Sequence, residues 1–262
     1  MKALLKLTWT EAKLFLREPQ AFFFTLFFPL VLLFVYGGIN GNAPKLMYAG
    51  FGTVDVSVPS YTAMIIATSG LISIPVIIAT YRESGVLRRF KATPLAPMAL
   101  LAADVFVIFV MTTMGMLLLI VSARIVFGLR FTGNILSLAL AFSLSCLSFF
   151  SLGFVLSGLM RTARTAQIVG MTLFFPMIML SGAAIPLETM PERIRVYSNF
   201  LPLTYVVKLL KGLWFGGTWA EHGTEVLVLA GLFVLGLVVT AKTFRWDLWT
   251  ERILAPESSS GH

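Results

Sequence analysis

Long apolar runs separated by short polar segments dominate the chain. Six of these runs reach the roughly 20 apolar residues that an α-helix needs to cross a bilayer, and they cover residues 21–39, 61–81, 100–126, 135–160, 165–184 and 226–244. Pro176 interrupts the fifth run, where we expect a kinked but continuous helix because neighbouring helices can satisfy the freed carbonyl. The pattern predicts an all-α integral membrane protein with six transmembrane helices.

The N-terminal segment has an amphipathic pattern instead. At about 100° per residue its four cations fall within an arc of roughly 60°, beside an arc of apolar side chains; the cations are Lys2, Lys6, Lys13 and Arg17. Such a helix lies in the headgroup region with its cations facing anionic lipid. We therefore expect an interfacial helix over 1–19 that ends at Pro19.

Composition supports the membrane assignment and gives it a direction. The chain is 58% hydrophobic and only 12% charged, against about 25% charged in soluble domains. With the N-terminus inside, the cytoplasmic segments carry 13 Lys and Arg residues and the outer segments carry 7. The positive-inside rule then places both termini in the cytoplasm. The net charge of +8 is explained by anionic headgroups and does not indicate nucleic acid.

Two segments between the spans differ from simple connections. In the cytoplasmic loop 82–97, Val86, Leu87 and Phe90 share a helical face that could dock a soluble partner; the alternative is a loop that only fixes topology. The segment 185–225 is long, proline-rich and too broken to cross the bilayer, which is typical of a re-entrant segment. It is either an outer gate or a surface cap.

Several chemistries find no support in the residues. No Walker motif is present, and one Cys with two His cannot form a zinc site or a His-based triad. Asp104 and Arg124 are expected to be interfacial charges near the two ends of the third span. Isolated acids do not favour an ion-driven carrier or a membrane-embedded lipid-modifying enzyme. Small residues of the fourth span, from Ser143 to Gly158, predict close helix packing.

Two stretches resemble the membrane permease subunits of type-2 ABC exporters, the class that includes daunorubicin and antibiotic-resistance permeases. The stretch RESGVLRRFKATPL at 82–95 is similar to the coupling segment of the family, with Val86 in place of Thr and Phe90 in place of Leu. LSGAAIP at 180–186 and LPLTY at 201–205 are similar to its second signature, with Leu201 in place of Asn. The six-span plan also matches, so the likeness covers essentially one permease domain over 1–255. The tail 256–262 is expected to be disordered or added to the natural chain.

The resemblance implies an assembly and a set of roles. Two copies of an ATP-binding subunit would bind ATP and Mg²⁺, and a second permease chain would complete a homodimer, so this chain would be no enzyme and hold no cofactor. A helix from Glu83 to Lys91 would sit in a cleft of the ATPase. The expected coupling residues are Glu83, Gly85, Leu87, Arg88, Arg89 and Lys91. The expected outer-gate residues are Ser181, Gly182, Pro186, Pro191, Pro202 and Tyr205. Between the two chains, the expected path is lined by Phe24, Phe28, Thr68, Ser73 and Met179.

The resemblance also implies a function, which is ATP-driven export across a bacterial or archaeal cytoplasmic membrane. Phe fills the interiors of the spans, whereas Tyr and Trp are mostly at their ends. This distribution favours a hydrophobic or amphipathic small molecule as cargo. The alternative within the family is a polysaccharide or lipid-linked glycan, whose path should offer stacking aromatics and polar side chains.

Overall fold

The computed structural model describes residues 22–85, 97–187 and 190–243. Every regular element in these ranges is helical, and six helices are long and apolar enough to cross a membrane. The prediction of an all-α protein with six spans is confirmed. The expected interfacial helix over 1–19 and the tail 256–262 lie outside the described residues.

The six spans are built from nine helical elements. The first joins η1 (Phe23–Phe27) to α3 (Phe28–Asn40), and the second joins α4 (Thr53–Thr68), η3 (Ser69–Ser73) and α5 (Ile74–Glu83). The remaining four spans lie within α7 (Pro97–Phe127), α8 (Ile135–Leu159), α9 (Ala163–Leu180) and α12 (Gly223–Thr243). Three shorter helices, η2 (Leu46–Tyr48), α10 (Glu192–Ser198) and α11 (Pro202–Trp214), lie between spans.

The second span starts at Thr53, eight residues before the predicted start at residue 61. Its first turns carry Asp55, Ser57 and Ser60, and these polar residues made the segment look too polar to be part of a span. All three are nevertheless buried inside the bundle. Ser57 and Ser60 donate to carbonyls one turn earlier, so burial leaves these hydroxyls satisfied. The predicted start was wrong because the sequence alone does not show that the surrounding helices bury these polar side chains.

The fifth span also ends earlier than predicted, at Leu180 instead of residue 184. Gly182 adopts a φ of +88°, a left-handed conformation that ends helices and suits glycine. The helix runs unbroken through Pro176, as expected.

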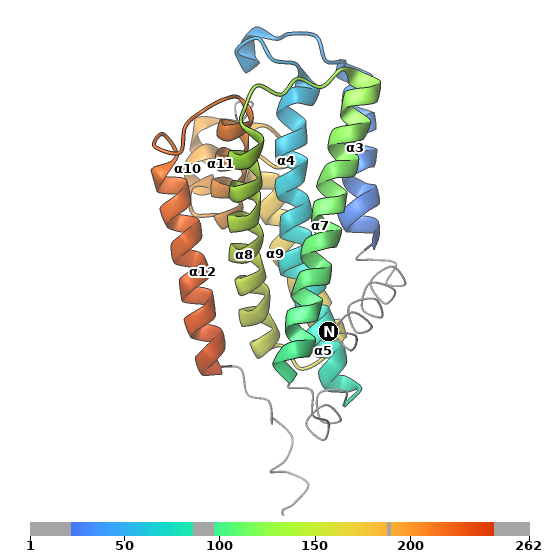
Figure 1. Ribbon diagram of the computed structural model, residues 1–262, viewed down its shortest axis with the longest axis vertical. Coiled ribbons are helices and arrows are strands. Elements are labelled where there is room, and N and C mark those ends of the chain that lie inside the picture. Colours follow the sequence, from blue (N-terminus) through green and yellow to red (C-terminus); the bar gives the residue numbers. More distant parts are fainter. Residues whose placement is uncertain (1–21, 86–96, 188–189, 244–262) are drawn as a thin grey trace, which may run out of the picture.

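The spans form a bundle around the second of them (Figure 1). In this view α7, α8 and α12 lie in front of α9, and α4 passes between α8 and α7. The loops that join α3 to α4 and α7 to α8 lie at one end, and the last residues of α5 and α12 lie at the other. We call these the outer end and the inner end.

Small residues of α8 pack against the sixth span. Ser148 Oγ donates to the carbonyl of Leu229 at 2.8 Å, and Ser151 Oγ donates to that of Leu232 at 3.4 Å. On α12, Gly236 lies so close to Ser151 that a Cβ there would overlap the hydroxyl. The prediction that this stripe of small residues serves packing is confirmed.

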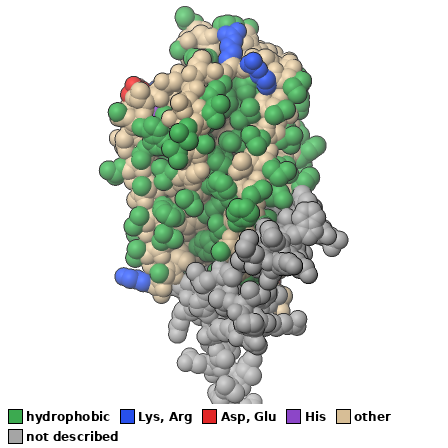
Figure 2. Space-filling model, in the orientation of Figure 1, with side chains coloured by type: hydrophobic (Ala, Val, Ile, Leu, Met, Phe, Trp, Pro, Cys, Tyr) green, Lys and Arg blue, Asp and Glu red, His purple; other side chains and the backbone are tan. Residues whose placement is uncertain are grey.

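The surface fits an apolar surrounding. On the face shown in Figure 2, hydrophobic side chains cover the middle, and Lys and Arg side chains lie toward its ends. Large apolar side chains of four spans are more than seventy per cent exposed: Ile39 at 78%, Ile125 at 77%, Ile135 at 76% and Leu227 at 73%. Such exposure suits lipid contact.

Candidate functional site

The second span is the centre of the molecule. It is one continuous helix from Thr53 to Glu83, and 89% of its most apolar 18-residue window is buried. Its elements pack against α3, α7, α8, α9 and α11. A five-residue π-turn, η3, lies in its middle, a feature often found at functional positions of helices.

Glycines let neighbouring backbones approach this π-turn closely. A Cβ on Gly70 would lie 2.5 Å from the carbonyl oxygen of Phe149 in α8. On the facing helices, a Cβ on Gly153 would collide with the carbonyl of Gly70, and one on Gly170 with the carbonyl of Leu71. Any side chain at these three positions would push α8 or α9 away from the second span.

At the outer end, Asp55 anchors the start of the second span. Its carboxylate accepts hydrogen bonds from the backbone N–H of Gly52 at 2.9 Å, the backbone N–H of Arg130 at 2.8 Å and the Asn42 amide at 2.9 Å. Asn42 Oδ1 in turn accepts from the N–H groups of Val54 and Asp55, which are free donors at a helix N-terminus. Asp55 and Asn42 therefore tie two outer loops to the second span. Neither residue was predicted from the sequence.

A small polar cavity lies between this anchored end and the turn after α9. It has a volume of about 180 Å³ and is lined by α3, α4, the loop before α4 and the turn 182–186. Its polar side chains are Tyr36, Asn40, Tyr48, Thr53, Ser57, Ser60 and Tyr61. We call it the outer cavity.

The predicted gate residues fall into two groups. Gly182 and Pro186 line the outer cavity, and the buried Ser181 shapes the turn by accepting the N–H of Ala183 at 3.3 Å. Pro191 instead directly precedes α10 as its N-cap, and Pro202 is the first residue of α11. The structure thus brings only the first group to the cavity.

Tyr205 holds the junction between α10 and α11. Its hydroxyl donates to the carbonyl of Asn199 at 2.8 Å, while Lys208 donates to the Asn199 side chain at 2.9 Å. Beyond this junction eight of the thirteen residues of α11 are buried, and the helix packs against α4, α8 and α12. At its end, Gly212 leaves room for the imidazole of His222.

At the inner end, the second span stops within the predicted coupling segment. Glu83 is the last residue of α5 and is exposed, and Gly85 follows with a φ of +67°. Glu83 therefore ends the second span and the chain turns at Gly85, and the docking helix that the resemblance implied stays a prediction, because its remaining residues lie outside the described ranges. Leu87, Arg88, Arg89 and Lys91 lie outside the described residues.

Arg82, counted in the sequence only as a cytoplasmic charge, forms hydrogen bonds between two spans. Its guanidinium donates to the carbonyls of Ser157 and Met160, which end α8 without helical partners. The inner end of the second span is thus joined to the inner end of α8.

Asp104 was expected at the interface and is instead 5% exposed. It accepts a hydrogen bond from the Tyr81 hydroxyl at 3.0 Å, so it faces α5 within the bundle. The expectation was wrong because Tyr81 offers a buried donor that spacing alone does not reveal. Arg124 is exposed at the outer end of α7, as expected.

The five predicted path residues are distributed over two environments. Phe24 stacks edge-on against Phe28 and Phe174, with ring centroids 5.6 Å and 6.3 Å apart, so the first span contacts α9. Thr68 and Ser73 are fully buried on the second span, whereas Met179 on α9 is 43% exposed. None of the five lines the outer cavity.

Comparison with known proteins identifies relatives of this chain. Residues 2–215 match the family model described as ABC-2 type transporter. The "Probable multidrug ABC transporter permease YbhS" of Escherichia coli K12 is 27% identical over 198 residues, which are 75% of this chain and 51% of that protein. The "Inner membrane transport permease YhhJ" of the same strain is 24% identical over 212 residues, or 76% of this chain and 54% of the relative. The chain spans about half the length of these curated relatives.

Proposed function

The chain belongs to the ABC-2 type transporter family, and from this premise we propose that it is the permease subunit of an ATP-driven exporter. Its cargo is a hydrophobic or amphipathic small molecule that leaves across a bacterial or archaeal cytoplasmic membrane. A separate ATP-binding subunit, in two copies, binds ATP and Mg²⁺ and supplies the energy. A second copy of the permease completes the path.

The observation that carries the proposal is the reach of the second span. Its inner end finishes at Glu83, in the segment similar to the family's coupling motif. Its outer end supplies Thr53, Ser57 and Tyr61 to the outer cavity, against Gly182 and Pro186 of the gate turn. One continuous helix therefore connects the place where an ATPase would act to the place where a gate would open.

The path runs along the side of the molecule formed by the first, second and fifth spans. The contact of Phe24 with Phe174 joins the first span to α9 beside the buried second span. Met179 and Phe175, exposed at 43% and 44% on α9, offer an apolar surface for the second permease chain. The segment 185–225 is the re-entrant outer gate of this path.

A second candidate cargo is a polysaccharide or lipid-linked glycan, and one observation favours it. The outer cavity contains three tyrosines, Tyr36, Tyr48 and Tyr61, together with hydroxyl and amide side chains. Such a lining can stack on and hydrogen-bond to a sugar. An amphipathic cargo with a polar head would use the same lining, and for this reason it remains our first choice.

The coupling role is tested with Glu83→Ala in the chain co-expressed with its ATPase. Glu83 is exposed at the inner end, so the variant should insert normally, whereas co-purification of the ATPase and substrate-stimulated hydrolysis should fall. Arg88→Ala should have the same effect. The matched control is Glu192→Ala, an exposed acid in α10. Unchanged coupling in both inner-end variants would overturn the role.

A further inference from the structure

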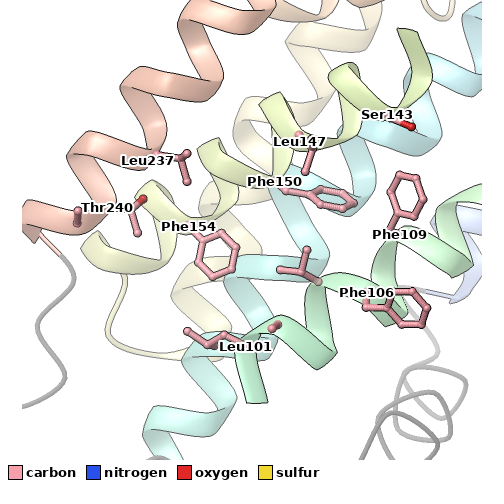
Figure 3. Close-up of a pocket in the computed structure, with 12 residues that line it drawn as sticks. Leu101, Phe106, Phe109, Ser143, Leu147, Phe150, Phe154, Leu237 and Thr240 are labelled. Carbon is pink, nitrogen blue, oxygen red and sulfur yellow. The ribbon is translucent and has the colours of Figure 1, made fainter. Parts of the chain in front are cut away.

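An apolar groove lies on the opposite side of the bundle from the proposed path. It has a volume of about 700 Å³ and is formed by side chains of α7, α8 and α12 (Figure 3). Its lining is Leu101, Ala102, Val105, Phe106, Phe109, Ser143, Leu147, Phe150, Phe154, Leu237, Thr240 and Ala241. In Figure 3 the rings of Phe106, Phe109, Phe150 and Phe154 lie along it. The volume is within the range of about 300–1,000 Å³ typical of small-molecule sites.

Only two of the lining side chains are polar, and they differ in whether their hydroxyl has a hydrogen-bond partner. Ser143 Oγ donates to the carbonyl of Ala139 at 2.8 Å, so its hydrogen-bonding capacity is used within α8. Thr240 Oγ1 is buried and has no hydrogen-bond partner in the part of the chain that the structure describes. A buried hydroxyl without a partner is costly, and Thr240 is the one polar group that the groove offers to a ligand.

The polar end of the groove coincides with the inner end of the bundle. Thr240 and Ala241 lie in the last turn of α12, next to the exposed Lys242. Under the orientation that the positive-inside rule predicts, this end is at the cytoplasmic surface. The groove therefore combines an apolar lining within the membrane, a buried and unpartnered hydroxyl near its inner end, and a cation beyond that end.

We propose that this groove binds one acyl chain of an anionic phospholipid of the cytoplasmic leaflet. The Thr240 hydroxyl donates to an ester carbonyl at the top of the acyl chain, and the Lys242 ammonium pairs with the phosphate. Aromatic and aliphatic side chains provide van der Waals contact to the chain itself, which an empty recess facing the bilayer would forfeit. The leaflet rests on the proposed orientation, whereas the groove and its lining do not.

Labelling with a photoreactive lipid tests the proposal. The full-length chain is placed in vesicles of phosphatidylcholine with a small fraction of phosphatidylglycerol that carries a diazirine in one acyl chain, and labelled peptides are identified by mass spectrometry. The label should concentrate on groove residues such as Leu147 and Phe150 rather than on Ile168, which is 57% exposed on α9. No ATPase is needed, so the result does not depend on the Glu83 experiment.

Two variants fill the groove from opposite walls. Ala102→Phe on α7 and Ala241→Phe on α12 place a ring where the lining side chain is now a methyl group, and each should reduce groove labelling to the level at Ile168. The matched control, Ala139→Phe, adds the same ring at an exposed position of α8 outside the lining and should leave groove labelling unchanged.

A third variant tests the headgroup contact. Because a Lys near an anionic membrane surface contributes about 1 kcal/mol, Lys242→Gln should lower the preference for phosphatidylglycerol over a phosphatidylcholine probe about fivefold. Equal labelling of the groove and Ile168, or groove labelling that survives both ring substitutions, would overturn the proposal. So would displacement of the probe from the groove by a second permease chain or by a transported substrate.

Discussion

The second and sixth spans are both long, apolar helices, yet they occupy opposite environments. In the most apolar window of each, 89% of residues are buried in the second span and 11% in the sixth. Both carry an acid in the first turn, Asp55 and Glu225, and both contain a central glycine, Gly70 and Gly231. The difference teaches that apolarity predicts a membrane-crossing helix, whereas the partners of its few polar and small residues show whether it faces protein or lipid.

The cavities beside the two spans show the same contrast. The outer cavity, at the end of the second span, has about 180 Å³ and seven polar lining residues. The apolar groove beside the sixth span has about 700 Å³ and two. In our account the first belongs to the cargo and the second to the surrounding lipid.

The largest difference in stability is expected between alanine variants of the two first-turn acids. Asp55→Ala removes the acceptor of two backbone N–H groups and the Asn42 amide, each of which is left buried or partly buried. At about 1–3 kcal/mol for an unsatisfied group, we expect a loss of about 2–4 kcal/mol in stability. Thermal unfolding in detergent measures it.

The matched control on the sixth span is Glu225→Ala. Glu225 Oε2 lies 3.8 Å from His222 Nδ1 and both side chains are partly buried, but Glu225 accepts no backbone N–H from the described residues, so we expect a loss of at most about 1 kcal/mol. Equal losses in the two variants would show that Asp55 acts only as a first-turn charge, and the contrast between the spans would fail.

The next largest difference in stability is expected between alanine variants of the two glycines. Gly70→Ala brings a Cβ to 2.5 Å from the carbonyl oxygen of Phe149, so α8 must move, at a cost of about 1–3 kcal/mol. Gly231 has no heavy atom within 4 Å of an added Cβ, so Gly231→Ala should be neutral or stabilise by up to about 1 kcal/mol through helix propensity. Denaturant titration of both variants in the same detergent gives the comparison. Destabilisation by both would contradict the account.

The smallest effect concerns the contact between α8 and the sixth span. Ser148→Ala removes the interhelical hydrogen bond to Leu229, and such bonds contribute on average about 0.6 kcal/mol in membrane proteins. Ser145→Ala removes a bond within α8 only and serves as the control. Denaturant titration in detergent measures the loss of stability in each single variant. If the two losses are equal, the hydrogen bond from Ser148 does not hold α12 in place.

The six spans could be predicted because lipid imposes a length and an apolarity that any bundle must meet. The start of the second span could not, since Asp55 finds its partners in loops that the sequence does not place side by side, namely Asn42 and the backbone of Arg130. The turn at Gly182 was marked by its motif, but the outer cavity also needs Tyr36 and Thr53 from other elements. The groove needs three spans at once, and Thr240 becomes notable only when its hydroxyl is seen to be buried without a partner.

The central claim is that the side of the first and fifth spans faces a second permease chain, while the groove side faces lipid. Cys146 is the single cysteine and is fully buried, so an introduced cysteine is the reactive one. Met179→Cys on α9 and Leu147→Cys on α8 are equally suitable positions, exposed at 43% and 40%. In membranes treated with a flexible bis-maleimide, we predict a crosslinked dimer for Met179→Cys and only monomer for Leu147→Cys. A dimer through Leu147→Cys with none through Met179→Cys would contradict the account.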